Sequence, residues 1–292
     1  MGSKLTNPIT RKNTAKGVGP DYRWALSSIQ GWKVNMNDFL AVVEQLADLK
    51  GYQLFIVADG HYGSRVARRV IIDLPHYIYR QIATQMTENG EYNPEDVKKA
   101  IQQAILEFDE DLGKEPGMTS IGSTVSGVLV TPTEFFFMNL GTSGASLCRN
   151  QELYFSTVAN VPSDPQEEAR IRRANGLVLK RRIFGRLKFS RAIGHFGLKR
   201  DKELSQTAQL VSALADVTVV KRNQETDDFI AIYTDGVTHQ MSSTELTTFI
   251  TKRIECKRNL EELNEEILDF CCHQKSKDNI TLVILHFNGS NL

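Results

Sequence analysis

Three aspartates stand at the ends of predicted strands that are far apart in the chain. Asp59-Gly60-His61 follows an apolar run, Asp235-Gly236 follows another, and Asp278 opens a third. A short apolar run that ends in Asp-Gly is typical of a buried strand stopping at a tight turn. Carboxylates and bare carbonyls bind hard divalent cations, and the imidazole can transfer a proton. Because a single Asp-Gly more often bonds only its own turn, the metal site is inferred from the whole set.

The composition excludes some functions. The 292 residues suffice for one large domain or two small ones. Lysine plus arginine equals aspartate plus glutamate, at 35 each, whereas nucleic-acid binders carry a basic surplus that meets phosphates. The basic runs 170–173 and 180–182 are interpreted as solvated faces. The sequence therefore argues against a nucleic-acid-binding protein.

Cysteine usage indicates a reduced compartment. The four cysteines are Cys148, Cys256, Cys271 and Cys272, and none forms a CxxC pair. Their spacing predicts neither a disulfide framework nor a zinc site. The chain shows no secretory signal and no apolar stretch of about 18 residues, so we expect a cytoplasmic protein without a membrane span.

The N-terminus carries a lipidation motif. Met1-Gly2-Ser3-Lys4-Leu5-Thr6 fits the pattern for N-myristoylation of Gly2. One acyl chain holds a membrane only marginally, but nearby basic residues add attraction to anionic lipid. A Met-Gly-Ser start is also common in recombinant proteins, which leaves acylation open. Residues 1–20 are polar and without period, so we expect a mobile leader before a single domain over residues 21–292.

Helical patterns occur in several places. Residues 64–86 show one apolar face, in which Pro75 implies a kink or a break. Asn93 is the expected cap of a second helix, with Pro94 in its first turn. Residues 39–49 suit either a helix or a strand. Further helices are predicted at 204–215, 244–254 and 260–271.

The chain becomes rich in strand patterns after Gly122. An antiparallel meander is expected at 123–130, 134–140 and 145–148, extended by 153–155, and later strands at 229–233 and 280–286. Residues 156–200 carry proline, glycine and many charges, which predicts a long irregular excursion beside a site. Strands and helices lie in blocks, without βαβ alternation or a glycine-rich nucleotide motif. This pattern indicates an α+β fold.

Seven motifs rich in glycine and polar residues are spread along the chain. They are Gly31-Trp32-Lys33-Val34-Asn35-Met36-Asn37-Asp38, Val57-Ala58-Asp59-Gly60-His61-Tyr62-Gly63, Gly122-Ser123-Thr124, Asn139-Leu140-Gly141-Thr142-Ser143, Ser190-Arg191-Ala192-Ile193-Gly194-His195, Thr234-Asp235-Gly236 and Asp278-Asn279-Ile280-Thr281. In order and spacing they resemble the motifs of the type 2C metal-dependent serine/threonine protein phosphatases. The resemblance runs from Trp24 to Phe287, nearly the whole chain.

The resemblance implies a four-layer α/β/β/α sandwich, in which two antiparallel sheets are flanked by helices, and a strand within residues 39–49. It also implies a single phosphatase-like catalytic domain, expected to be a monomer that acts on phosphoprotein substrates. Two Mg²⁺ or Mn²⁺ ions would be the cofactors, and a water that they activate would attack phosphorus.

The roles of individual residues also follow from the resemblance. Asp59 would be shared by both ions, Asp235 and Asp278 would complete one of them, and the Gly60 carbonyl would bind the other. His61 would donate a proton to the leaving oxygen, so that Asp59 and His61 are the catalytic pair. Lys33 would bind the substrate phosphate. Asn37, Asp38 and Asn279 would lie around the metals.

The sequence departs from the family pattern at several polar positions. Lys33 replaces an arginine and loses its bidentate fork, and Asn37 replaces a glutamate near the metals. Thr142 and His239 replace aspartates that the family associates with an additional, weaker metal site, so we expect that ion to be absent. His195 replaces a further aspartate, and Tyr62 fills a glycine position beside the site.

Two functions remain open at this point. The chain is a working phosphatase, slowed by these departures, or a pseudophosphatase that binds phosphoproteins or partners without turnover. Every residue expected to contact the two main metals directly is present: Asp59, Gly60, Asp235 and Asp278. The changes affect residues that tune affinity and rate, which favours the working enzyme.

Overall fold

The computed structural model of the chain describes residues 4–87, 89–256 and 259–287. By contacts within the chain they form two compact units. The first unit comprises Met1–Asp38, Gly144–Thr157 and Lys221–Leu292, and the second comprises Phe39–Ser143 and Val158–Val220. That residues 21–292 act as a single catalytic domain stays a prediction.

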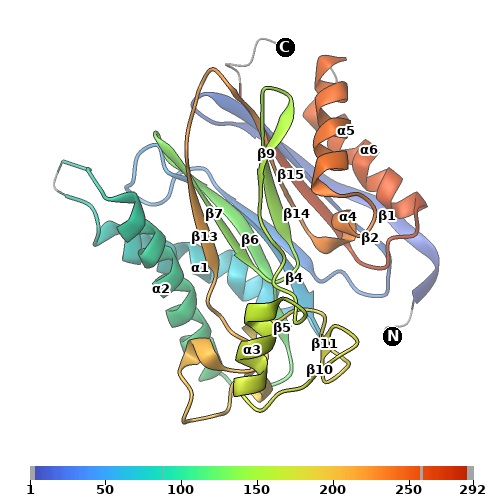
Figure 1. Cartoon of the computed structure of the whole chain (residues 1–292). Coiled ribbons are helices and arrows are strands. Elements are labelled where there is room, and N and C mark those ends of the chain that lie inside the picture. The colour runs from blue at the N-terminus through green and yellow to red at the C-terminus, as the bar shows by residue number, and fades with distance from the viewer. Residues whose placement is uncertain (1–3, 88, 257–258, 288–292) are drawn as a thin grey trace. The chain divides into compact units, whose positions relative to one another are not determined.

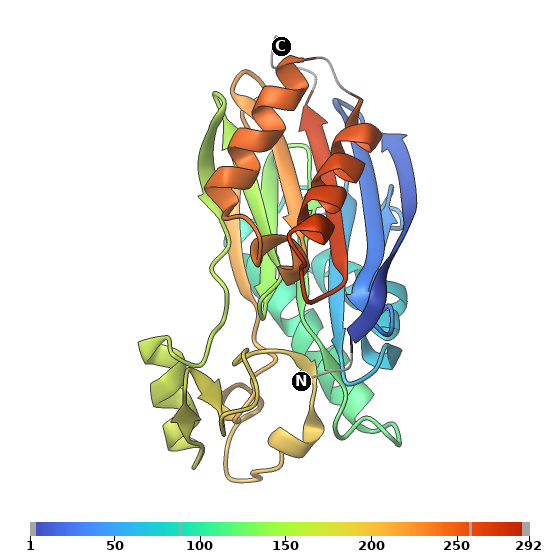
Figure 2. The same ribbon diagram turned by 90° about the vertical axis from the view of Figure 1, so that its right-hand side faces the viewer.

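The first unit is one antiparallel sheet with the strand order β1-β2-β15-β14-β8-β9. Two helices, α5 and α6, cover one face of this sheet (Figure 2). Their apolar sides pack on strand residues such as Ile29 and Ile284 to form a buried core. The elements are β1 Lys4–Val18, β2 Tyr22–Lys33, β8 Gly144–Arg149, β9 Glu152–Ser156, β14 Asp227–Tyr233, β15 Ile280–Phe287, α4 Asp235–Thr238, α5 Ser243–Glu255 and α6 Leu260–His273.

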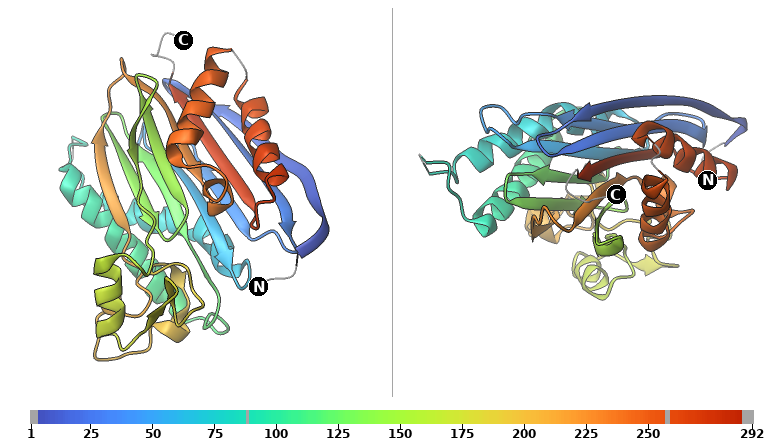
Figure 3. Two further views of the ribbon diagram at one scale, coloured as in Figure 1. Left: turned by 45° about the vertical axis from the view of Figure 1, so that its right-hand side comes forward. Right: turned by 90° about the horizontal axis from the view of Figure 1, so that it is seen from above.

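The expectation of a mobile leader is wrong for Lys4–Val18. This segment is an edge strand that pairs antiparallel with β2, and Figure 3 shows it running along that side of the sheet. The Thr14 hydroxyl also donates to Glu265 of α6. Backbone hydrogen bonds to a neighbouring strand hold a segment whose side chains are mostly exposed, so no apolar period announces it. Gly2 and its myristoylation motif begin outside the described residues.

The predicted meander is also wrong in one connection. The strand Gly144–Arg149 pairs with β14 and β9 in the first unit, not with the preceding strand Glu134–Leu140. Gly141, at a φ of 108°, lies in the connection between these two strands. Alternation within a strand specifies its faces but not its partner, so the change of sheet leaves no local signal.

The second unit is built on a sheet with the order β12-β5-β4-β6-β7-β13, and β3 also pairs with β4. The two helices α1 and α2 pack against this sheet and each other around a core that includes Ile56, Leu129 and Phe136. The elements are β3 Asp38–Val43, β4 Gln53–His61, α1 Arg65–Ala83, α2 Pro94–Gly113, β5 Gly122–Ser123, β6 Val125–Val130, β7 Glu134–Leu140, β12 Ile193–Gly194 and β13 Asp216–Lys221.

Local signals predicted these helices well. The side chain of Asn93 accepts a hydrogen bond from the Glu95 backbone N–H and caps α2, and Pro94 is its first residue. Of the kink or break predicted at Pro75, the break is ruled out, because helix α1 continues through this residue. The strand implied within residues 39–49 is present as β3.

Residues 156–200 are more regular than expected. They contain α3 Pro165–Arg173, a hairpin of β10 Val178–Leu179 and β11 Arg182–Ile183, and the short 3₁₀ helix η1 Phe196–Leu198. Figure 1 shows α3 and this hairpin lying together. A small core of its own supports this region, formed by Ile171, Ile183, Phe189, Ala192 and Val211.

The helix predicted at 204–215 is wrong. Only the three-residue 3₁₀ helix η2 Gln206–Ala208 forms there. The Gln209 side chain donates to the carbonyls of Asp201 and Leu204, and the Ser212 backbone N–H donates to Ser190. Tertiary hydrogen bonds thus replace the helical ones.

Two antiparallel sheets, each with helices packed on it, confirm the predicted α+β class. Among the described residues no helix combines the length and the apolar character needed to cross a membrane.

Candidate metal centre and active site

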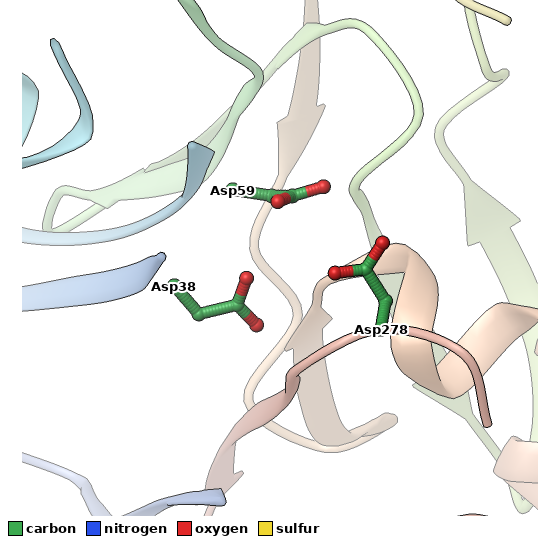
Figure 4. Close-up of side chains that lie close together, drawn as sticks. All are labelled: Asp38, Asp59 and Asp278. Carbon is green, nitrogen blue, oxygen red and sulfur yellow. The ribbon is translucent and has the colours of Figure 1, made fainter. Parts of the chain in front are cut away.

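The first unit brings the carboxylates of Asp38 and Asp278 together. Ligand-capable oxygens of the two residues lie within 4.8 Å of each other. Figure 4 shows the two side chains close together. Asp38 Oδ2 accepts hydrogen bonds from the hydroxyls of Thr234 at 2.7 Å and Thr281 at 2.8 Å. Thr234 follows β14 and Thr281 lies at the start of β15, so neighbouring strands orient the carboxylate.

The electrostatics of this pair favour a bound cation. The pKa of Asp38 is raised to about 7, chiefly by burial and then by the nearby Asp278 charge, against the lowering effects of Lys33 and the two threonines. Asp38 Oδ1 accepts no hydrogen bond from any residue that the structure describes. Two carboxylates this close resist joint ionisation unless a cation lies between them. Oxygen ligands of this kind fit Mg²⁺ or Mn²⁺.

Lys33 and Asn279 frame the carboxylate pair. The Lys33 ammonium donates to Asp278 Oδ1, so this substitution keeps a positive charge at the site. Asn279 Oδ1 accepts from the Asn37 backbone N–H at 2.8 Å, and its amide group donates to the carbonyls of Gln30 and Asn35. Asn279 therefore anchors the loop after β2 through backbone atoms.

Asp235 is the first residue of α4 and is buried. His239, one turn later, has its Nδ1 3.9 Å from Asp235 Oδ1. A Cβ on Gly236 would lie 1.9 Å from the Asn279 carbonyl oxygen. Only glycine lets this turn pack directly against Asn279, which gives the Asp-Gly motif a steric reason.

The second unit carries Asp59, Gly60 and His61. Strand β4 extends through all three, so the tight turn predicted at Asp59-Gly60 is wrong. Pairing of Gly60 with Ser123 and of His61 with Gly122 continues the strand, and the turn comes at the next two residues. The Asp59 carbonyl accepts from the backbone N–H of Thr124 at 3.0 Å. These bonds fix the strand end that bears the carboxylate.

His61 lies in an aromatic setting. Its Nε2 is 3.6 Å from Asp59 Oδ2, and its ring centroid is 4.5 Å from that of Phe189. The ring centroid of His195 lies 5.2 Å from that of Phe189 and 6.0 Å from that of Tyr62. Burial lowers the pKa of His195 to about 4, with a further contribution from Lys199, so its imidazole is neutral near pH 7.

The sequence reasoning missed the two threonines and Phe189. Thr234 and Thr281 are polar residues at the ends of apolar strands and belong to the two late motifs, but the motifs gave them no role; their position was an available signal. Phe189 lies in the segment expected to be irregular, and no local pattern ties it to His61. Among the predicted site residues, the first unit groups Lys33, Asn37, Asp38, Asp235, Asp278 and Asn279, and the second groups Asp59, Gly60 and His61.

Comparison with known proteins agrees with these features. The family model described as Protein phosphatase 2C matches residues 22–280. Protein phosphatase 1A of Bos taurus is 36% identical over 98% of this chain and 76% of its own length. Protein phosphatase 1B of Rattus norvegicus is 37% identical over the same shares.

Solved structures share the fold. The serine-threonine phosphatase 2C from Toxoplasma gondii superposes with a TM-score of 0.79 at 20% identity, over 98% of this chain and all of that one. A sex-determining protein from C. elegans superposes with a TM-score of 0.76 over 93% of this chain and 66% of that one. From the family match and the curated relatives, the chain belongs to the protein phosphatase 2C family.

Proposed function

We propose that this chain hydrolyses phosphoserine and phosphothreonine in proteins with the help of two divalent metal ions. The Asp38–Asp278 pair is the observation that carries the proposal, because its geometry and raised Asp38 pKa call for a cation. Asp59, Asp235 and Asp278 would hold the ions through their carboxylates, and the Gly60 carbonyl would contribute a further oxygen. When bound, Mg²⁺ or Mn²⁺ supplies an acidified water and neutralises phosphoryl charge.

The residues of the chain divide the remaining work. Lys33, held by Asp278, offers a single positive charge to the substrate phosphate. Asp38 and Asn279 position their neighbours through the hydrogen bonds described above rather than touching substrate. His61, whose Nε2 lies 3.6 Å from Asp59 Oδ2, donates a proton to the departing serine or threonine oxygen.

The alternative is a pseudophosphatase that binds phosphoproteins without turnover. The loss of a carboxylate at Asn37 and the bulk of Tyr62 beside His61 support it, since the first weakens metal binding and the second narrows the approach. Both alternatives share the same surface, so only turnover separates them.

The decisive experiment measures phosphate release from a phosphothreonine peptide at millimolar Mn²⁺ or Mg²⁺. Asp235→Asn removes a proposed ligand, and Glu152→Gln, an exposed residue of the same unit, is the matched control. We expect metal-dependent release in the wild type and control, and its loss in Asp235→Asn. A folded wild type with no release and no metal binding by calorimetry would establish the pseudophosphatase.

We also propose a cytoplasmic monomer that contacts membranes through myristoylated Gly2. The motif at residues 1–6 and the basic residues after it support this proposal. Mass spectrometry after co-expression with an N-myristoyltransferase tests acylation, and light scattering after gel filtration tests the oligomeric state. An unmodified N-terminus would refute the myristoylation of Gly2, and a dimeric mass would refute the monomer.

A further inference from the structure

The second unit contains a pocket of about 500 Å³ beside the Asp-Gly-His motif. Tyr62, the residue after His61, forms part of its wall. Apolar side chains supply most of the rest, and Arg186 is its charged lining residue. The volume suits one large apolar side chain together with part of its backbone. The lining includes Ile183, Phe184, Leu187, His195 and Leu198.

The pocket lies in the most basic part of the chain. Residues 177–200 contain eight lysines and arginines and neither aspartate nor glutamate, although the whole chain carries equal numbers of both signs. Arg191 bonds Glu167 and Asp216, and Lys199 bonds Asp109. Arg182 and Arg186 are exposed, and neither forms an ion pair with a residue that the structure describes. These two charges are available to a partner.

Large apolar side chains accompany these charges on the surface. Tyr62 is 70% exposed, Leu179 49% and Phe184 46%. Tyr62 and Phe184 also hold left-handed backbone conformations, at φ of 60° and 49°. Aromatic residues pay for such a conformation with about 1–3 kcal/mol of strain, which the surrounding structure must offset. Exposed rings in strained positions around a pocket mark a recognition surface.

We propose that the pocket and the β10–β11 hairpin dock the phosphoprotein substrate and select its sequence. An apolar residue beside the phosphorylated serine or threonine enters the pocket, and acidic residues flanking it bind Arg182 and Arg186. This inference rests on the proposed phosphatase function and adds the substrate class. A concave pocket favours a peptide side chain over a lipid surface, which would leave the pocket unfilled.

Three phosphothreonine peptides test the selectivity. One carries leucine and two glutamates near the phosphothreonine, the second replaces the glutamates by glutamines, and the third replaces leucine by serine. We expect wild-type kcat/KM to fall about tenfold from the first peptide to the second, because each exposed ion pair contributes modestly and is screened by salt. A fall of about fivefold is expected for the third, from the loss of buried apolar surface.

Matched variants assign these preferences to the surface. Arg182→Gln with Arg186→Gln should reduce the glutamate preference to about twofold, and Phe184→Ala should remove most of the leucine preference. Arg172→Gln with Arg173→Gln in α3 removes the same charge from the same unit and should leave both preferences intact. Equal turnover of all three peptides, or an equal effect of the α3 control, would overturn the proposal.

Binding measurements separate this inference from catalysis. Fluorescence anisotropy of the labelled peptides reports docking even without turnover. Selective binding that the arginine variant loses, with no phosphate release, would leave docking standing and refute hydrolysis. Phosphate release without any preference among the three peptides would support hydrolysis and refute docking. Sedimentation with phosphatidylserine–phosphatidylcholine vesicles tests whether the two arginines bind an anionic membrane instead. If the arginine variant loses vesicle binding but keeps the wild-type peptide selectivity, substrate docking is refuted.

Discussion

The two units position their functional residues by different means. In the first, hydrogen bonds fix the polar groups: two threonines hold Asp38, and Asn279 makes one hydrogen bond to β2 and two to the loop after it. In the second, aromatic packing and left-handed backbone shape the surroundings of His61, with His195 at a φ of 54°. Hydrogen bonds thus fix the polar groups of the first unit, whereas ring packing and backbone conformation shape the surroundings of His61 in the second.

Departures from the family pattern follow the same division. In the first unit Lys33 retains a charge beside Asp278, and Asn37 contacts Asn279 through its backbone. In the second unit Tyr62 and His195 add bulk around the pocket. With His239 in the first unit and Thr142 in the second, each unit carries three departures, and those of the first lie beside proposed metal-binding residues.

Neutralising the Asp278 carboxylate in the first unit is expected to have the largest effect. Asp278→Asn removes a proposed metal ligand and the partner of Lys33, so we expect phosphate release to fall at least about 100-fold, beyond the effect typical of residues around a metal site. Mn²⁺ affinity by calorimetry should fall with it. Retained activity with unchanged metal binding would show that the first unit does not hold the metal.

Removing the hydroxyls that orient Asp38 is expected to have a smaller effect. Thr234→Val with Thr281→Val preserves shape but leaves the buried carboxylate without those donors, which costs about 1–3 kcal/mol of unfolding free energy for each bond. Mn²⁺ affinity should weaken about 10- to 100-fold. Thr248→Val on the exposed side of α5 is the control; chemical denaturation and metal titration give both quantities.

The pH dependence of stability compares the units directly. Burial lowers the pKa of His195 in the second unit and of His286 in the first to about 4. The unfolded chain binds these protons near pH 6.5 and the folded chain does not, so stability is full above pH 6.5 and declines as the pH falls toward 4. We expect a decline of about 1–3 kcal/mol per histidine.

Asparagine suits the left-handed backbone at position 195, so His195→Asn isolates the second unit's share. The free energy of unfolding of this variant, measured with urea, should decline between pH 6.5 and pH 4 by only about half as much as that of the wild type. An unchanged pH profile would mean that His195 gains its proton without cost to folding.

Restoring the family's arginine should have the smallest effect. Lys33→Arg returns a planar fork that can bind two phosphate oxygens, and we expect kcat/KM to rise about two- to fivefold, mainly through KM. Peptide preferences should not change, since the second unit sets them. Altered selectivity in this variant would contradict the separation of roles.

Much of the site could be predicted from sequence because its motifs are local. The cap at Asn93 and the strand ends beside Asp235 and Asp278 depend on neighbouring residues, and the structure confirms them. The motif order indicated the family and, with it, the enzyme class that the relatives confirm. The assignment of ligand, proton donor and phosphate binder stays a prediction.

Only the tertiary structure decided which distant groups meet. Lys4–Val18 becomes a strand because β2 offers it backbone partners, and 204–215 fails as a helix because Gln209 and Ser212 bond elsewhere. Thr281 finds Asp38 across 243 positions of sequence. Local residue types determine the secondary-structure preference of each segment. The partners of its hydrogen bonds and of its buried side chains, however, are the residues that the tertiary structure brings near. The sequence alone therefore indicated the class of reaction through its motifs. The tertiary structure determined which residues hydrogen-bond to the site carboxylates and which residues line the pocket.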